Sequence, residues 1–234
     1  MILWLQLKTH YTQIEEASLY NLKLKGKNFR SAILFTIARA MHAQNPDKLS
    51  NPELDKFENT KQYDQVVALA ACIEIAHNAS LLQDDIIDRA DSRRSQQAAH
   101  KVFGPSTSVF ASDFMISRAS RMLTYQFDNS HISQLFSTAI YNLVFGELIQ
   151  AKRDLKQTKS LGQDDNTFEE IDYQDFFESY IAKTYYKTAS MISLGCRGLG
   201  IIFNLDIENQ RRLFDFGAHL GIAFQIHDDI LDFT

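Results

Sequence analysis

The chain has 234 residues, of which 45% are hydrophobic and 23% are charged, so it predicts a folded protein with a sizeable core and excludes a disordered one. Its formal net charge of −5 provides no field that would attract nucleic acid. The best candidate for a membrane span, residues 66–82, contains Glu74, His77 and Asn78, so we expect no transmembrane segment.

Few prolines and long runs of helix-forming residues predict an all-α protein. Helices are expected over residues 3–25, 29–43, 64–90, 107–126, 132–151, 173–194 and 207–232. Between them, residues 44–60 are expected to form a loop with at most a short helix, 91–105 a helix-to-helix connection, and 155–172 a mobile polar loop. No repeat and no internal boundary is visible, so we expect one domain over residues 1–234.

Glycine and cysteine positions add detail to this outline. Gly26 is expected to end the first helix, and three closely spaced glycines to break the sixth: Gly195, Gly198 and Gly200. In the last helix, Gly217 and Gly221 share a face with aspartates and are expected to leave space above them. Cys72 and Cys196 lack metal-type spacing and are expected to be buried, reduced thiols. The first residues lack the features of a signal or transit peptide.

An acidic motif near the end of the third predicted helix is the strongest functional signal in the chain. His77, Ser80, Asp84 and Asp88 share one face of that helix, although most of its residues are apolar. Asp84 and Asp88 are an i,i+4 pair about 6 Å apart. Their repulsion would reach roughly 3 kcal/mol at an effective dielectric near 20, so a sheltered site needs a cation between them. Such carboxylates suit Mg²⁺, which often shares its coordination sphere with substrate phosphates.

The same spacing occurs again at Asp228, Asp229 and Asp232, after another apolar helical run. A single copy could be a solvated acidic turn or a helix N-terminus, where aspartate is favoured. Two copies favour a shared ligand that combines metal ions with a polyanion. Lys27 and Arg30 could bind phosphate at the start of a helix, although a solvated basic face explains this pair better when it is taken alone.

Together these motifs resemble those of the trans-prenyl diphosphate synthases, in the family's order and over nearly the whole chain. The matching motifs are Gly26-Lys27-x-x-Arg30, Glu74-x-x-His77-x-x-Ser80, Asp84-Asp85-x-x-Asp88 with Arg93-Arg94, Lys187-Thr188-Ala189-Ser190, and Gly221-x-x-Phe224-Gln225-x-x-Asp228-Asp229-x-x-Asp232. Residues 183–190 and 221–225 look closest to the long-chain synthases, of the decaprenyl and solanesyl type, that make the ubiquinone side chain.

The resemblance implies an isoprenoid-synthase-type helical bundle around a deep central cavity. It implies an enzyme, a prenyltransferase that elongates an allylic diphosphate with isopentenyl diphosphate to a long-chain all-trans polyprenyl diphosphate. Two or three Mg²⁺ ions would assist ionisation. The resemblance further implies a mitochondrial location, with the cytoplasm as the alternative, and a homodimer or a hetero-oligomer with a second synthase subunit. Product release would involve peripheral contact with a membrane.

The resemblance also assigns roles to individual residues. Mg²⁺ would be held by Asp84, Asp88, Asp228 and Asp232, with Asp85 and Asp229 in support. The allylic diphosphate would contact Arg93, Lys187, Thr188 and Gln225, and isopentenyl diphosphate would contact Lys27, Arg30, His77 and Arg94. Lys187-Thr188 is preferred because the family's pair precedes alanine; Lys183-Thr184 is the second choice. Ala79 and Ser80, about one turn before Asp84, leave the path of a growing chain open and predict a long product.

The sequence also departs from the family pattern. Ser31 stands where the family usually has proline, and His227 adds an ionisable group beside Asp228. Family members continue past the position of Thr234, so the domain is expected to lack C-terminal helices, and the chain could bind substrate without turnover.

Other functions fit parts of the pattern. A non-catalytic or regulatory subunit of a heteromeric synthase would be expected to lack one aspartate cluster. A short-chain farnesyl or geranylgeranyl diphosphate synthase would use the same chemistry. A di-iron carboxylate protein would need a second Glu-x-x-His besides Glu74-x-x-His77, and the chain has none. A terpene cyclase would carry a different second metal motif.

Overall fold

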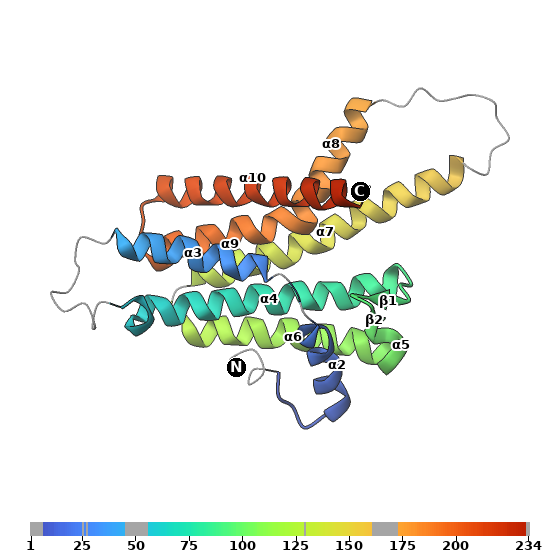
Figure 1. Cartoon of the computed structure of the whole chain (residues 1–234), viewed down its shortest axis with the longest axis horizontal. Helices are drawn as coiled ribbons and strands as arrows, with labels where there is room; N and C mark the ends of the chain where they lie inside the picture. Colours follow the sequence, from blue (N-terminus) through green and yellow to red (C-terminus); the bar gives the residue numbers. More distant parts are fainter. Residues whose placement is uncertain are drawn as a thin grey trace. The chain divides into compact units, whose positions relative to one another are not determined.

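A computed structural model describes residues 7–24, 26, 28–44, 56–128, 130–160 and 173–232, and it leaves the side chains of 152–160 and 173–175 undescribed (Figure 1). Its helices are α2 (Thr12–Lys23), α3 (Phe29–Ala43), α4 (Lys61–Ile87), α5 (Ala99–Phe103), α6 (Pro105–Gln126), α7 (Ser130–Ser160), α8 (Tyr173–Thr184), α9 (Ser190–Ile202) and α10 (Ile207–Leu231). A 3-10 turn η1 (Phe57–Asn59), a π-helical turn η2 (Tyr185–Ala189) and two short strands, β1 (Ser92–Arg93) and β2 (Gln96–Gln97), complete the described structure. The all-α prediction is confirmed.

The chain divides into two compact units, which we describe separately. The first comprises residues 1–136 and 201–205, and the second comprises residues 137–200 and 206–234. The sequence analysis saw no boundary inside the chain, and the single domain over 1–234 stays a prediction.

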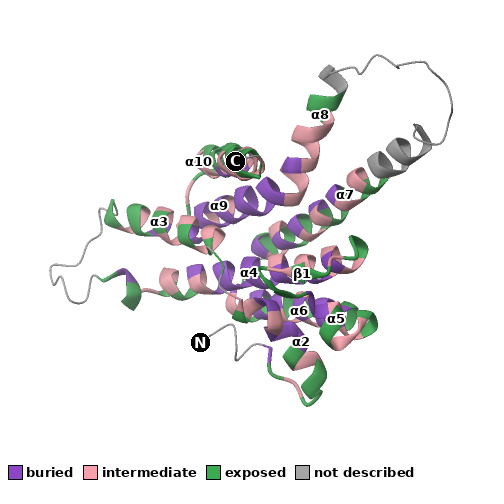
Figure 2. Cartoon of the chain, turned by 45° about the vertical axis from the view of Figure 1, so that its right-hand side comes forward, coloured by how far each residue is buried: buried purple, intermediate pink, exposed green. Residues whose placement is uncertain are grey.

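Helix α4 forms the core of the first unit. Thr60 caps its start, because its hydroxyl oxygen accepts from the backbone N–H of Tyr63 at 3.1 Å. Much of the helix is buried (Figure 2), and small residues let it approach α6 closely. The buried Ser112 hydroxyl of α6 donates to the Ala79 carbonyl at 3.0 Å, which ties the two helices together. This packing holds the acidic end of α4 in place.

Within the described residues, two helical stretches, Lys61–Ile87 and Ser130–Ala151, are long and apolar enough to cross a membrane by length and composition alone. In α4, 72% of the apolar window is buried inside the protein, as in the core helix of a soluble protein; in the α7 stretch the share is 33%. By themselves, length and composition are weak evidence for a membrane span.

In the second unit, α10 packs against η2 and α9 at glycines. A Cβ atom on Gly217 would lie 2.6 Å from Ser193 Cα, and one on Gly221 would lie 2.5 Å from Ala189 Cα. These distances are far below an ordinary contact, so only glycine allows the backbones to come this close. The expectation that Gly217 and Gly221 leave space above the aspartates is therefore wrong: backbone from η2 and α9 fills that space.

Other boundaries also differ from those predicted. The first described helix begins at Thr12 rather than near residue 3, and residues 7–11 are not helical. Helix α7 continues to Ser160, and residues 161–172, part of the expected loop, lie outside the described residues. The three glycines that were expected to break the sixth helix instead lie inside α9, which runs to Ile202. Glycine costs a helix only about 1 kcal/mol relative to alanine, and burial of the apolar face of α9 outweighs this cost.

Candidate active site

The first acidic cluster lies at the C-terminal end of α4. Asp84 is half-buried, Asp85 is 1% exposed, and Asp88 is an exposed C-cap residue. The C-terminal end of a helix carries partial negative charge, which disfavours carboxylates and favours cations. The alternative of a helix N-terminus that favours aspartate is therefore wrong for this cluster.

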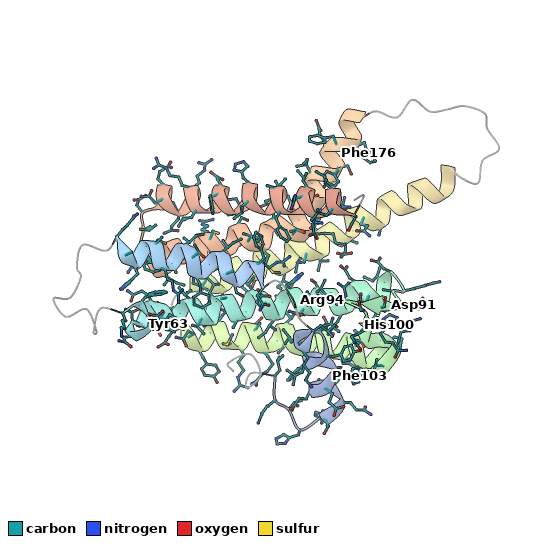
Figure 3. The ribbon with its side chains drawn as sticks, in the orientation of Figure 1. Tyr63, Asp91, Arg94, His100, Phe103 and Phe176 are labelled. Carbon is teal, nitrogen blue, oxygen red and sulfur yellow. The ribbon has the colours of Figure 1, made fainter. Side chains whose placement is uncertain are left out.

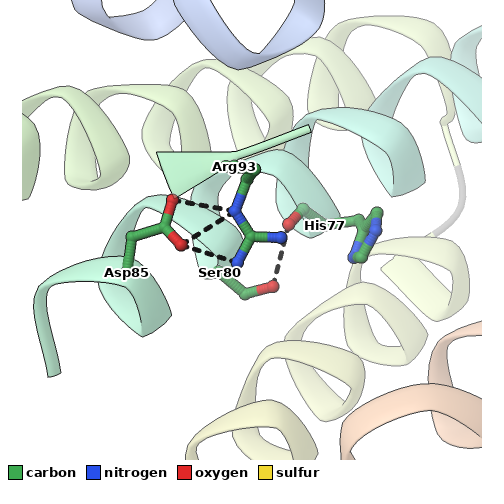
Figure 4. A network of polar contacts seen from close by, with 4 residues as sticks. All are labelled: His77, Ser80, Asp85 and Arg93. Atoms are coloured by element: carbon green, nitrogen blue, oxygen red, sulfur yellow. Dashed lines mark hydrogen bonds and ion pairs between the residues drawn. The ribbon is translucent and has the colours of Figure 1, made fainter. Parts of the chain in front are cut away.

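The middle aspartate of the cluster is bound within the protein. Asp85 accepts from Arg93 Nε at 2.8 Å through both of its carboxylate oxygens, and Arg93 Nη2 lies 2.7 Å from Oδ1 (Figure 4). A charged pair with this many contacts is strong and orients both groups. It fixes the β1–β2 hairpin to α4, and the metal role expected of Asp84 and Asp88 stays a prediction. Arg93 was expected to contact the allylic diphosphate; here its guanidinium is directed at Asp85, and that role stays a prediction.

The tip of the hairpin presents Arg94. Arg94 and Ser95 have left-handed backbone angles, with φ of 49° and 63°, between the paired residues Arg93 and Gln96. Two left-handed residues in a two-residue loop match the tight hairpin turn whose twist suits the strands, although non-glycine residues are strained there. Such strain often marks functional positions.

Arg94 and Gly26 lie close together within the first unit. Arg94 is labelled in Figure 3, and its Nη1 donates to the Leu24 carbonyl at 3.2 Å. A Cβ atom on Gly26 would lie 2.8 Å from Arg94 Nη1, so glycine makes room for this guanidinium. The helix ends at Lys23, before the predicted glycine. Lys27, which was expected to bind isopentenyl diphosphate, lies outside the described residues.

His77 lies within a cluster of positive charge. Burial lowers the pKa of His77 well below its usual value, and the charges of Arg30, Arg94 and Arg93 lower it further. The imidazole is therefore neutral at neutral pH. The charges of three arginines act on one uncharged histidine and disfavour a metal cation there, which argues against the di-iron interpretation of Glu74-x-x-His77.

The two residues expected to set product length differ in their surroundings. Ala79 is fully buried, and its carbonyl accepts the Ser112 hydrogen bond from α6. Ser80 is half-buried, and its hydroxyl donates to the His77 carbonyl at 2.8 Å (Figure 4). Of the two, only Ala79 is enclosed well enough for a larger side chain to meet immediate resistance.

In the second unit, four polar residues form one hydrogen-bonded chain. The Thr188 hydroxyl donates to Gln225 Oε1 at 2.9 Å, and Gln225 Nε2 donates to Asp229 Oδ1 at 2.7 Å. The Tyr180 hydroxyl donates to Asp229 Oδ2 at 2.6 Å. Burial raises the pKa of Tyr180, and the bond to Asp229 raises it further, so the phenol keeps its proton. The structure brings Thr188, Gln225 and Asp229 together; the sequence analysis gave Tyr180 no role.

The second acidic cluster repeats the design of the first. Helix α10 ends at Leu231, and Asp232 is its exposed C-cap residue, while Asp228 is half-buried one turn earlier. Asp229, the middle aspartate, is bound by Tyr180 and Gln225, as Asp85 is bound by Arg93. In both clusters the protein restrains the middle carboxylate, and an outer i,i+4 pair lies at the negative end of a helix.

Lys187 is held by α7 within the same unit. Its Nζ lies 2.7 Å from Glu147 Oε1 and donates to Gln150 Oε1 at 2.9 Å. Gly146 allows this approach, because a Cβ atom there would lie 2.6 Å from Lys187 Cγ. Lys187 and Thr188 belong to the π-helical turn η2, and such turns occur frequently at functional sites. The sequence analysis assigned no role to Glu147 or Gln150.

The second-choice pair, Lys183-Thr184, is placed differently. The Lys183 ammonium lies 5.8 Å from the centre of the Tyr180 ring, a cation–π distance, and Thr184 is 1% exposed. Thr188 donates to Gln225 in the Asp229 network, whereas Lys183 lies beside Tyr180 of that network, and the choice between the two pairs stays a prediction.

The helical architecture of this chain matches that of solved structures. A decaprenyl diphosphate synthase from Rhodobacter capsulatus has a crystal structure that matches 99% of this chain and 61% of its own, with a TM-score of 0.75 and 25% identity. A polyprenyl synthase from Caulobacter crescentus, complexed with calcium and isoprenyl diphosphate, shares the fold at a TM-score of 0.76, 24% identity and coverage of 99% and 60%. The chain therefore has the all-α fold of the isoprenoid synthases.

Sequence comparison identifies the family. Residues 11–234 match the polyprenyl synthetase family, and the chain belongs to it. Solanesyl diphosphate synthase 3 (chloroplastic/mitochondrial) of Arabidopsis thaliana is 36% identical over 211 residues, which cover 90% of this chain and 46% of the relative. The human all-trans-polyprenyl-diphosphate synthase is 32% identical over 223 residues, with coverage of 95% and 47%. A probable mitochondrial hexaprenyl pyrophosphate synthase of Yarrowia lipolytica is 35% identical over 199 residues, with coverage of 83% and 42%. The chain spans about half the length of these relatives.

Proposed function

We propose that the protein is a prenyltransferase that elongates an allylic diphosphate with isopentenyl diphosphate to a long-chain all-trans polyprenyl diphosphate. The observation that carries this proposal is the duplicated acidic helix end. A helix C-terminus disfavours two carboxylates, a bound cation would offset this cost, and the chain makes this arrangement twice.

The outer aspartates fit Mg²⁺. In the described residues, no three His, Cys, Asp or Glu side chains gather into a complete metal site. A pair of carboxylates per cluster suits an ion that keeps several waters and takes its remaining ligands from substrate phosphates. Asp84 with Asp88, and Asp228 with Asp232, would hold two or three such ions, which would neutralise the leaving diphosphate and favour its departure.

The remaining side chains would position the two substrates. Arg30, Arg94 and neutral His77 offer donors to isopentenyl diphosphate, and Lys27 would add a charge to this group. Lys187 and Thr188, with Gln225, would bind the allylic diphosphate; Lys187 would exchange Glu147 for a phosphate oxygen. After the allylic C–O bond breaks, the double bond of isopentenyl diphosphate attacks the allylic carbon and a proton is lost. The protein contributes by placing charge and by excluding water.

The names of several relatives support a long product and a location in an organelle. The Arabidopsis, Yarrowia and human proteins are named as solanesyl, hexaprenyl and polyprenyl synthases, and the Yarrowia name includes "mitochondrial". We propose the same here: a mitochondrial enzyme that supplies the ubiquinone side chain, as a homodimer or with a second synthase subunit.

The test is a direct assay of chain elongation. The protein is incubated with farnesyl diphosphate, labelled isopentenyl diphosphate and Mg²⁺, alone and with candidate partner subunits, and the dephosphorylated products are separated by chromatography. Long-chain products that vanish on chelation of Mg²⁺ are expected. Products no longer than geranylgeranyl diphosphate would indicate a short-chain synthase, and no incorporation under any of these conditions would overturn the proposal.

A further inference from the structure

A carboxylate from α4 caps the start of α3. Ser31 is the third residue of α3, and both its donors reach Glu74 Oε1: the backbone N–H at 3.2 Å and the hydroxyl at 2.6 Å. The first N–H groups of a helix have no partner inside it. Asn28, the N-cap residue, is left-handed with φ of 45° and its side chain makes no capping bond. Glu74 therefore supplies a cap that the local sequence does not.

The same carboxylate compensates the charge of Arg30. Glu74 is 8% exposed, and its charge raises the pKa of Arg30, against a larger lowering by burial. Arg30 directly precedes Ser31, so the anion that caps the helix start also acts through its charge on the guanidinium beside it. This arrangement differs from a simple ion pair, because Glu74 binds the α3 backbone and side chain with one oxygen.

The Arg30 guanidinium has one donor that makes no hydrogen bond in the described part of the chain. Its Nε is buried and has no hydrogen-bond partner in the described part of the chain. A buried unpaired donor costs about 1–3 kcal/mol, and a substrate oxygen that accepted from it would remove this cost. Neutral His77 and Arg94 belong to the same cluster, so an anion would find several donors there.

We propose that Glu74 and Ser31 are positioning residues that orient Arg30 towards a diphosphate oxygen of isopentenyl diphosphate. This inference rests on the proposed function. Glu74 would touch no substrate: it would set the position of α3 and of Arg30 through Ser31. Hydroxyl and carboxylate would contribute separately, because the backbone N–H of residue 31 remains when the hydroxyl is removed.

The experiment compares the kinetics of both substrates in variants of the full chain. Ser31→Ala removes the hydroxyl, Glu74→Gln keeps the shape and an acceptor oxygen but removes the charge, and Ser31→Thr restores a hydroxyl. Thr36→Ala is the control: it removes a hydroxyl from an exposed position of the same helix, where it donates to the Ala32 carbonyl.

The Michaelis constant for isopentenyl diphosphate is expected to rise about tenfold in Ser31→Ala, a single lost hydrogen bond to a charged group, and at least as much in Glu74→Gln. The constant for farnesyl diphosphate and kcat should stay within about twofold of the parent protein. Ser31→Thr should recover most of the loss, and Thr36→Ala should match the parent.

Thermal unfolding of each variant separates positioning from stability. If the constants for both substrates rise together, in step with a lower melting temperature, Glu74 and Ser31 are only structural and the inference is overturned. The same holds if the constant for isopentenyl diphosphate does not change. Should Glu74→Gln fail to fold, Ser31→Ala decides alone. A parent protein without elongation activity would overturn the proposed function instead, as a distinct result.

Discussion

The contact of Gly221 with Ala189 predicts that one methyl group added to α10 separates it from η2. In Gly221→Ala the new Cβ would lie 2.5 Å from Ala189 Cα and 2.7 Å from its Cβ, where ordinary contacts begin at 3.4 Å. Backbone cannot rotate away as a side chain can, so the helices must move apart by about 1 Å. Gln225 lies one turn further along α10, and Thr188 precedes Ala189. Their 2.9 Å hydrogen bond would therefore be lost.

Two opposing effects set the magnitude. Alanine improves helix propensity by about 1 kcal/mol over glycine. Overpacking costs about 1–3 kcal/mol, and the lost hydrogen bond about 1 kcal/mol more. The cost of overlap with the backbone outweighs the gain in helix propensity. We therefore expect the free energy of unfolding, measured by denaturant titration, to fall by about 1–3 kcal/mol in Gly221→Ala.

Gly217→Ala is the matched control, because its Cβ would lie 2.6 Å from Ser193 Cα, away from the Thr188 network. Both variants should lose similar stability, but only Gly221→Ala should also lose affinity for farnesyl diphosphate in the presence of Mg²⁺, by roughly tenfold. A Gly221→Ala variant as stable as the parent would refute the packing argument. Equal loss of affinity in both variants would refute the link between this packing and the diphosphate site.

Three further predictions follow from the first unit and from the acidic clusters. Asp84→Asn and Asp228→Asn should each reduce elongation by at least about a hundredfold at fixed Mg²⁺, because each removes a charge that would hold the metal; near-parental rates in the radiolabel assay would contradict the metal role. On the path of the growing chain that the family resemblance implies, a ring at residue 79 would block elongation, so Ala79→Tyr should shorten the product on chromatography; an unchanged product would contradict this. The pKa of His77 is lowered in the folded chain, so as pH falls the unfolded chain takes up the His77 proton at a higher pH than the folded chain does. The free energy of unfolding should therefore decrease as pH falls below about 6.5, by up to about 1.4 kcal/mol per pH unit. The free energy of unfolding, measured by denaturant titration at several pH values, should depend less steeply on pH in His77→Gln than in the parent protein; an equally steep dependence would contradict this.

The sequence predicted those features that depend on local spacing. The helical periodicity located most helices, and the Asp-Asp-x-x-Asp spacing located both acidic clusters near the ends of α4 and α10. Placement of these clusters at helix C-termini is what removed the alternative of an ordinary N-terminal aspartate.

Features that depend on contacts distant in sequence were not predictable. Arg93 reaches Asp85 only because two non-glycine residues adopt the left-handed conformation in the hairpin turn, and propensity argues against that. Lys187 of η2 forms an ion pair with Glu147, which lies 40 residues earlier in the sequence, and no pattern within either helix indicates this pair. Gly200, inside α9, was read as a helix breaker, although a close approach to Gln210 explains it.

The π-helical turn η2 has a consequence for how this segment can vary. A π-helical turn accommodates one residue more than an α-helical turn. In this turn Lys187 contacts Glu147 on α7, while the adjacent Thr188 donates to Gln225 on α10. Loss of any single residue between 185 and 189 would restore regular winding and rotate one of these neighbours by about 100° away from its partner. Substitutions that preserve the residue count should therefore be tolerated here far better than a one-residue deletion, and the length of this short segment is itself under constraint.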